Sequence, residues 1–238
     1  MPDFTQQVTV DQRFNGPPGC GNGGYVCGLL AASLPGTVEV TLKEPIPLDK
    51  HLLRKSNAVT AAQLLDAERL LAEARVQQLR MDVPDPPDYQ AACDAATRYI
   101  GFDHHSFPHC FVCGPDRVAG DGLQIFTGPV EGKEMVAAPW CPDSTLANAD
   151  GLIRREFIWA ALDCPGAFAH FIHASPKPVV LGRFHARVEQ DLLPGERCVV
   201  TGWPLGRHER KLFSGTAVFN EKGDLCAVAQ AVWIALKG

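Results

Sequence analysis

The 238-residue chain has no surplus of basic residues, and no stretch concentrates lysine and arginine as a nucleic-acid-binding surface would need. Its 27 acidic residues outnumber its 22 lysines and arginines, which gives a formal net charge of −5. A protein that binds nucleic acid through phosphates needs a basic face, so the composition argues against that partner. The apolar fraction of 46% is typical of a globular protein large enough to bury its own core.

Segments that direct a chain to or through a membrane are also missing. The N-terminus has no basic segment followed by an apolar one, so we expect no signal peptide. The longest apolar stretch, residues 157–172, contains Asp163 and Pro165 and is too short to span a bilayer. The 9 cysteines are odd in number and do not follow the spacing of a disulfide framework. We therefore expect reduced thiols, a cytoplasmic location and no membrane partner.

Two distant segments share one pattern. The first, residues 22–31, opens with Asn-Gly-Gly and continues as an apolar run without an acid. The second, residues 156–163, is a similar apolar run that lacks the glycines and ends in an aspartate. Superimposing them pairs Tyr25 with Phe157, Leu30 with Leu162, and Ala31 with Asp163. We interpret the two segments as copies of one duplicated unit. The first copy retained the glycines at the start of the helix, and the second retained the acid.

The order of predicted elements repeats as well. Alternation of apolar and polar residues predicts strands, and the apolar runs after the glycines and before Asp163 predict helices. The first half has a strand at 5–14, a helix at 23–34, a strand at 38–43 and a hairpin at 61–79. The second half has strands at 123–126 and 135–140, a helix at 153–173, and strands at 180–188, 197–203, 211–219 and 225–236.

The hairpin at 61–79 is predicted against local propensity. This segment is rich in Ala, Leu, Glu and Arg, which favour helix. Its counterpart at the end of the chain is strand-like, so we expect two strands that turn near residues 66–68. Proline-rich residues 83–88, which can continue neither a helix nor a central strand, mark the boundary between the halves. We therefore assign residues 1–81 and 120–238 to two repeats, and residues 82–119 to a linker and structured loop.

Three short motifs carry a resemblance to a known family. They are Cys110-Phe111-Val112-Cys113-Gly114-Pro115 with Gly120-Asp121-Gly122-Leu123, then Ala161-Leu162-Asp163-Cys164-Pro165-Gly166-Ala167, and finally Gly223-Asp224-Leu225-Cys226-Ala227. The second half resembles the phenylacetyl-CoA-thioesterase-like branch of the hotdog superfamily, and the whole chain resembles a double hotdog. The resemblance implies an α+β fold, a tandem hotdog in which each half packs a long helix on a twisted antiparallel sheet. It also implies that a pseudo-twofold axis relates the halves.

Gly23, Gly24 and Asp163 are the leading candidates for chemistry. The first amide N–H groups of a helix have no partner within it, and with the helix dipole they can bind an oxyanion. Asp163 lies among apolar neighbours, where a carboxylate must be paired, protonated or functional. The similar family uses an acid here as nucleophile or general base. The glycines could instead serve only the helix entry turn, and Asp163 could be structural. Asn22 occupies the place of the family's usual histidine.

Spacing decides how these candidates combine. Eight residues along one helix span about 12 Å, so glycines and an acid on the same helix cannot contact one substrate atom. In the hotdog family the two parts come from opposite protomers, and here the duplication would supply both. The mirror site would pair Ala31 with Arg154 and Arg155, without glycines or a carboxylate. We therefore expect one composite active site per chain.

Other residues are weaker candidates for substrate binding. Gln230 could orient a water, as a strand-borne glutamine does in the similar type II acyl-CoA thioesterases. Arg183, together with neighbouring basic residues, could meet CoA phosphates. Tyr25 and Trp159 could line an acyl pocket. A solvated or sheet-capping role for Gln230 and Arg183, and a core role for the two aromatic residues, are the plainer alternatives.

A cysteine pair raises the question of a metal. Cys110 and Cys113 lie close in sequence to His104, His105 and His109. A structural zinc site needs four ligands, typically from two such pairs, and the sequence offers one pair. The similar family carries such cysteines without a metal. We therefore expect no metal, and no cofactor apart from CoA as part of the substrate.

These features together favour hydrolysis of an acyl-CoA or related acyl thioester. One alternative is a non-catalytic hotdog protein that binds acyl thioesters or lipids, which Asn22 favours. An enoyl-thioester hydratase or dehydratase fits less well, because no histidine lies in the helix segment. A homodimer is expected, since closed dimers are the commonest oligomers. The acyl group cannot be inferred from the sequence.

Overall fold

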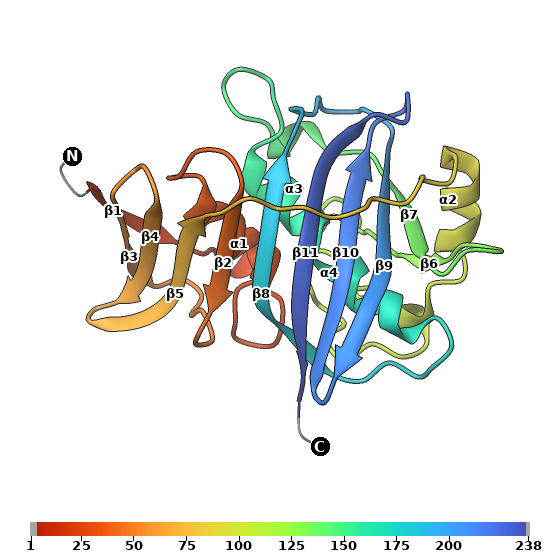
Figure 1. Cartoon of the computed structure of the whole chain (residues 1–238), viewed down its shortest axis with the longest axis horizontal. Coiled ribbons are helices and arrows are strands. Elements are labelled where there is room, and N and C mark those ends of the chain that lie inside the picture. Colours follow the sequence, from red (N-terminus) through yellow and green to blue (C-terminus); the bar gives the residue numbers. More distant parts are fainter. Residues whose placement is uncertain (1–3, 237–238) are drawn as a thin grey trace.

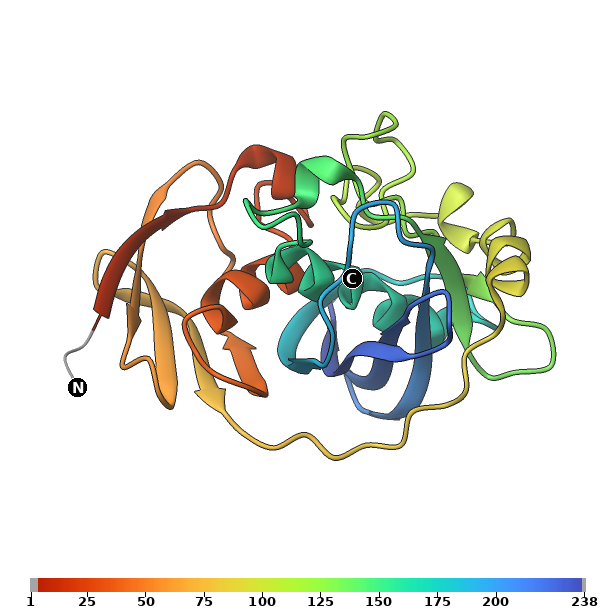
Figure 2. The ribbon, with the colours of Figure 1, turned by 90° about the horizontal axis from the view of Figure 1, so that it is seen from above.

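The computed structural model describes residues 4–236, which form one curved antiparallel sheet with the helices at 23–31 and 155–168 on one face and the helix at 89–96 on the other (Figures 1 and 2). The strand order is β1-β3-β4-β5-β2-β8-β11-β10-β9-β7-β6. The strands are β1 Phe4–Thr9, β2 Val38–Leu42, β3 His51–Ser56, β4 Ala61–Asp66, β5 Arg69–Val76, β6 Gly128–Pro129, β7 Val136–Trp140, β8 Val179–Val188, β9 Cys198–His208, β10 Lys211–Phe219 and β11 Leu225–Ala235. The helices are α1 Gly23–Ala31, α2 Tyr89–Ala96, α3 Arg155–Ala161 and α4 Asp163–Phe168.

Each side of the sheet is built from one half of the chain in the same succession. β2 and β8 are neighbours at the border between the two halves. Outward from this border, the strands of the first half follow in the order β2, β5, β4, β3 and β1, and those of the second half in the order β8, β11, β10, β9 and β7. Helix α1 lies between β1 and β2 in the chain, just as α3 and α4 lie between β7 and β8. In Figure 2 these three helices lie together on the same side of the sheet.

Two glycines let α1 and α3 pack closely. A Cβ atom added at Gly28 would lie 2.5 Å from the Cα of Glu156, and one added at Gly24 would lie 2.6 Å from the carbonyl oxygen of Trp159. The two glycines are four residues apart, so they share one face of α1. Only hydrogen atoms fit on this face, which brings the start of α1 against the end of α3.

The hairpin predicted at 61–79 is confirmed as β4 and β5, with Ala67 in the turn at a φ of 54°. Buried and exposed residues alternate along β4, and its inward side chains Ala62 and Leu64 pack in the core. The gain from burying this face outweighs the helix preference of the segment. After the prolines, residues Tyr89–Ala96 form α2 within the linker.

Two predictions were wrong. The helix expected at 153–173 is divided at Leu162 into α3 and α4, followed by a 3-10 turn at Ala169–Phe171. Pro165 explains the break, because it lacks an N–H donor and its ring clashes with the carbonyl of residue 161 in a continuous helix. Each half therefore has short helices, not one long helix. The strand expected at 123–126 is a loop, in which Gln124 has a φ of 52°.

The linker crosses the face of the sheet opposite α1, α3 and α4 (Figure 1). The His185 ring donates to the carbonyl oxygen of Gln77 at 3.0 Å, and Arg187 donates to the carbonyl oxygen of Leu79 at 2.8 Å. Met81 packs on this face beside a hydrophobic cluster that includes Trp203 and Phe219. We call residues 77–88 the strap. Within residues 4–236, no helix is long and apolar enough to cross a membrane.

Candidate active site

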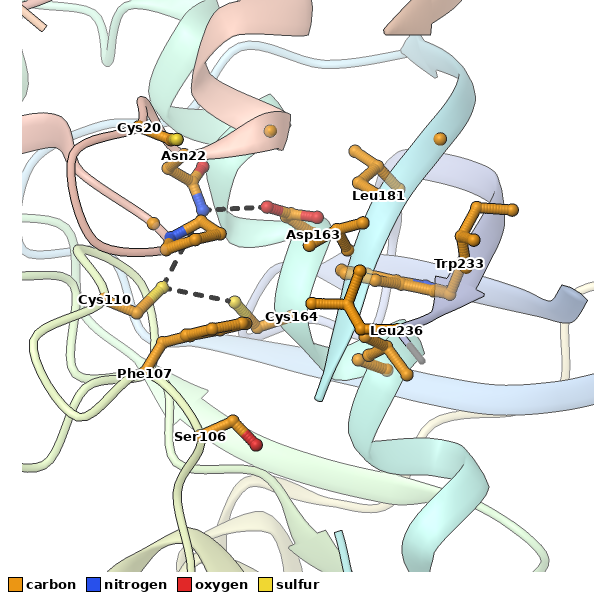
Figure 3. A pocket seen from close by; sticks show the side chains of 18 of the residues that line it. Cys20, Asn22, Ser106, Phe107, Cys110, Asp163, Cys164, Leu181, Trp233 and Leu236 are labelled. Atoms are coloured by element: carbon orange, nitrogen blue, oxygen red, sulfur yellow. Dashed lines mark hydrogen bonds between the residues drawn. The ribbon is translucent and has the colours of Figure 1, made fainter. Parts of the chain in front are cut away.

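Asp163 lies where the two halves of the chain meet. It is the first residue of α4, immediately after the helix break, and its side chain is 2% exposed. Its Oδ2 atom accepts hydrogen bonds from Asn22 Nδ2 at 2.8 Å and from the Gly24 amide at 3.0 Å (Figure 3). The carboxylate of one half is therefore held against the helix N-terminus of the other.

Asn22 connects the helix cap to the carboxylate. Its Oδ1 atom accepts from the Tyr25 amide at 2.9 Å, as an N-cap residue does. Its Nδ2 atom donates to Asp163, so both ends of the amide group are engaged and its orientation is determined. An asparagine here supplies a hydrogen-bond donor to the acid without adding a positive charge.

The surroundings of Asp163 shift its protonation towards neutral pH. Burial raises the pKa of Asp163 to about 7, partly opposed by the Gly24 N–H, while the nearby Cys110 sulfur raises it further and the Asn22 amide lowers it. Among residues 4–236, no hydrogen-bond partner meets its Oδ1 atom. The carboxyl group is thus held through one oxygen, while the other is buried without a partner. An unpaired carboxyl oxygen is the kind of group that can serve as a base or nucleophile.

A cavity of about 490 Å³ opens beside this carboxyl group. Asp163, Asn22 and Gly23 line it together with mostly apolar residues. These include Leu42, Ile46, Phe107, Phe168, Phe171 and Leu181. An apolar cavity with a few convergent polar groups is the usual form of a small-molecule site.

The two glycines of α1 have different roles. The Gly24 amide is occupied by Asp163. The Gly23 amide makes no hydrogen bond to any residue in the described part of the chain, and Gly23 lines the cavity. A Cβ atom at Gly23 would lie 2.9 Å from the Cδ2 atom of Leu181. The helix N-terminus therefore has one unpaired amide in a residue that lines the cavity, whereas the sequence predicts two.

The start of α3 differs from the start of α1. Its N-cap residue, Arg154, makes no capping hydrogen bond through its side chain. The Arg154 guanidinium instead lies over the Phe157 ring, 4.5 Å from its centroid, and 3.5 Å from a carboxylate oxygen of Glu156. Neither a glycine pair nor an aspartate facing the helix start is found there, so this end of α3 lacks the arrangement at Asp163.

Gln230 and Arg183 lie away from the cavity. Gln230 is opposite His185 in the β8–β11 ladder, and His185 bonds to the strap, which places Gln230 on the strap face of the sheet. The Arg183 guanidinium lies 4.0 Å from a carboxylate oxygen of Glu39. The structure does not bring either residue to Asp163.

Tyr25 and Trp159 are buried beside the site without lining the cavity. The Tyr25 ring stacks on Phe14 with centroids 4.3 Å apart. The Trp159 ring meets the edge of Phe184, with centroids 5.6 Å apart, and its carbonyl packs on Gly24. Both side chains therefore support the helix pair that positions Asp163.

Several residues that line the cavity were not assigned to the active site from the sequence. Cys110, Cys113 and Cys164 form part of its wall, and the exposed side chain of Lys177 also lines it. Cys164 follows Asp163 directly in the sequence, and this adjacency is the one feature of the sequence that places a cysteine at the site. Nothing in the spacing indicates that the loop at 110–113 reaches α4.

Neither a protein-family model nor a curated protein matches the chain, whereas many solved structures do. The tesB protein of Mycobacterium avium subs paratuberculosis has a TM-score of 0.62 at 14% identity, over 99% of this chain and 93% of that one. A hotdog-fold protein of unknown function from Alicyclobacillus acidocaldarius has a TM-score of 0.60 at 12% identity, over 99% and 94%.

A protein from Novosphingobium aromaticivorans, described as a candidate thioesterase, has a TM-score of 0.61 at 13% identity. The match covers 98% of this chain and 96% of that one. The chain therefore has the hotdog fold, in agreement with its antiparallel sheet and with α1, α3 and α4 on one face of it. At these identities the likeness shows the fold alone.

Proposed function

We propose that the chain hydrolyses an acyl thioester at a single composite site centred on Asp163. The observation that carries this proposal is the buried carboxyl group, which is held through Oδ2 by Asn22 and Gly24 and has Oδ1 free beside an apolar cavity. Similar folds described as a tesB protein and as a candidate thioesterase support it.

The chemistry follows from the positions of these groups. The acyl chain occupies the apolar cavity, and the thioester carbonyl accepts a hydrogen bond from the open Gly23 amide at the positive end of α1. Asp163 removes a proton from water, whose oxygen attacks the carbonyl carbon, and the C–S bond breaks to give a carboxylic acid and a thiol. In the alternative route, Asp163 attacks directly and water hydrolyses the resulting anhydride.

Coenzyme A is the proposed thiol. Lys177 is exposed, lines the cavity and makes no ion pair with another residue of the described chain. A lysine in this place can bind a phosphate that remains outside the cavity while the acyl group is inside. This assigns CoA recognition to Lys177 in place of Arg183.

A second candidate is an acyl-thioester or lipid-binding protein without catalysis. It is favoured by Asn22, which replaces the usual histidine of the similar family and uses both ends of its amide in structural hydrogen bonds. In that protein Asp163 would only join the two halves. An enoyl-thioester hydratase is a more distant candidate, tested by following hydration of an enoyl-CoA.

Thiol release from a panel of acyl-CoA esters tests the proposal directly. With short, long and aromatic acyl groups, we expect free CoA to accumulate with at least one ester at a rate proportional to protein concentration. Binding of the same esters should be measured in parallel by calorimetry. Tight binding without thiol release would favour the binding protein, and neither binding nor release would end both candidates.

The rate should depend on pH through Asp163. Since the carboxylate is the reactive form and burial raises the pKa of this group to about 7, kcat/KM should rise with pH and level off above about pH 7. Below that value each pH unit should lower kcat/KM about tenfold. Initial rates in buffers of constant ionic strength, corrected for spontaneous hydrolysis, give the profile. A flat profile between about pH 5 and pH 8 would contradict the role of Asp163.

We further propose that the fold is a tandem hotdog whose halves, residues 1–81 and 120–238, are related by a pseudo-twofold axis near the border of β2 and β8. The matching succession of strands on the two sides supports this proposal. Residues 82–119 would then connect the repeats. A homodimer and a cytoplasmic location are further proposals that rest on composition and on the commonest symmetry of oligomers.

A further inference from the structure

Three buried sulfur atoms meet in the wall of the cavity. Cys110 and Cys113 come from the loop before β6, and Cys164 comes from α4, next to Asp163. The three Sγ atoms all lie within 4.8 Å of one another, and those of Cys110 and Cys164 are 3.7 Å apart (Figure 3). The contact joins residues that are 54 positions apart in the chain.

These separations match the ligands of a tetrahedral thiolate site. A zinc ion with Zn–S bonds of about 2.3 Å holds any two sulfur ligands about 3.8 Å apart. The Cys110–Cys164 distance of 3.7 Å is already close to that value. The upper limit of 4.8 Å for the other pairs requires only small side-chain rotations.

The loop that carries two of these sulfurs turns tightly at Gly114. The Gly114 amide donates to the carbonyl oxygen of Cys110 at 2.9 Å. A Cβ atom at Gly114 would lie 2.5 Å from the Cys110 nitrogen and 2.5 Å from the carbonyl oxygen of Pro108, so a larger residue does not fit. The glycine therefore permits the turn that brings Cys110 and Cys113 towards one point.

His105 supports the cluster from outside. Its Nδ1 atom accepts from the Phe107 amide at 2.9 Å, so the ring proton resides on Nε2. That nitrogen lies 3.3 Å from Cys113 Sγ and donates to it. Such a hydrogen bond from an outer partner is typical of metal thiolates. Since Nε2 is a donor here, the fourth ligand would be a water from the cavity.

We propose that Cys110, Cys113 and Cys164 bind one thiophilic metal ion, Zn²⁺, in the cavity wall beside Asp163. The sequence predicts no metal site because it contains only one closely spaced cysteine pair. The fold brings a third sulfur, from α4, to this pair. Oxidation of two of the thiols to a disulfide would leave the third without a function, whereas a metal uses all three. The proposal does not depend on thioester hydrolysis.

Cobalt provides the test, because tetrahedral thiolate–Co²⁺ complexes absorb visible and near-ultraviolet light. The full-length protein, reduced and freed of metal with a chelator, is titrated with Co²⁺ and then with Zn²⁺. We expect one Co²⁺ per chain, a sulfur-to-cobalt charge-transfer band, and loss of both cobalt and band when Zn²⁺ is added. Cys164→Ser should weaken Co²⁺ binding by at least about tenfold, the loss seen even for outer partners.

Cys93→Ser is the matched control, since Cys93 lies on α2 and outside the cluster. It should bind Co²⁺ like the wild type. If Cys164→Ser does not fold, alkylation of the wild type followed by peptide mass spectrometry replaces it, and Zn²⁺ should protect Cys110, Cys113 and Cys164 selectively. The absence of a charge-transfer band in the wild type overturns the proposal. Equal alkylation with and without Zn²⁺, or a disulfide in the fresh protein with no Co²⁺ bound after reduction, also overturns it.

Discussion

Replacing Asp163 by asparagine is expected to abolish thioester hydrolysis and to stabilise the fold at alkaline pH. Asparagine keeps the shape, can accept from Asn22 and Gly24 through its carbonyl oxygen, and places its NH₂ group where Oδ1 has no partner in the described chain. It cannot act as base or nucleophile. Turnover should fall on the order of a thousandfold or more, while binding of the acyl-CoA ester largely survives.

The effect on stability follows from the sign of the pKa shift. Folding raises the pKa of Asp163 from 3.8 to about 7, so the folded state binds the proton more tightly than the unfolded state. Wild-type stability is therefore lost as the pH rises from about 4 to about 7, on the order of 4 kcal/mol in total. Asparagine does not titrate and avoids this loss.

Thermal unfolding at about pH 4 and at about pH 8 measures this difference, because Asp163→Asn should unfold at a higher temperature than the wild type only at the higher pH. Asp103→Asn, at an exposed position, is the control and should match the wild type in turnover and in stability. Wild-type turnover in Asp163→Asn would refute the composite-site mechanism, and a binding protein would then be the better description.

Substituting valine for Gly28 is expected to separate α1 from α3. The added Cβ atom would lie 2.5 Å from the Glu156 Cα and 2.9 Å from the Trp159 Cβ, so α3 must move. Overpacking of this kind costs roughly 1–3 kcal/mol, equivalent to a decrease of several degrees in the melting temperature. Because α3 leads directly into Asp163, its movement should also reduce turnover.

Helix propensity predicts the opposite sign for this change, since valine is a better helix former than glycine. The direction of the shift in thermal unfolding therefore separates close helix packing from local preference. Ala32→Val, at the exposed end of α1, adds bulk in solvent and should change the melting temperature little. A Gly28→Val protein as stable as the wild type would mean that the two helices do not depend on the glycine.

The repeated order of elements could be predicted because period-2 and apolar patterns are local properties of the sequence. The same comparison predicted the hairpin formed by β4 and β5, although residue preferences favour helix there. The repeat pattern predicts one continuous helix, whereas Pro165 breaks it at Leu162. The positive φ of Gln124 is incompatible with the strand predicted at 123–126. No residue type near this position predicts such a backbone conformation.

The sequence by itself determined most of the order of strands and helices, but not β3, and it determined the buried acid at position 163 and the glycines at the start of α1. Only the tertiary structure decided which groups meet, because those contacts join residues far apart in the chain. The hydrogen bond between Asn22 and Asp163 spans 141 positions, and the approach of Cys110 to Cys164 spans 54. The strap likewise occupies the face that carries His185 and Gln230. Periodicity and spacing describe one segment at a time, whereas the sheet places these segments side by side.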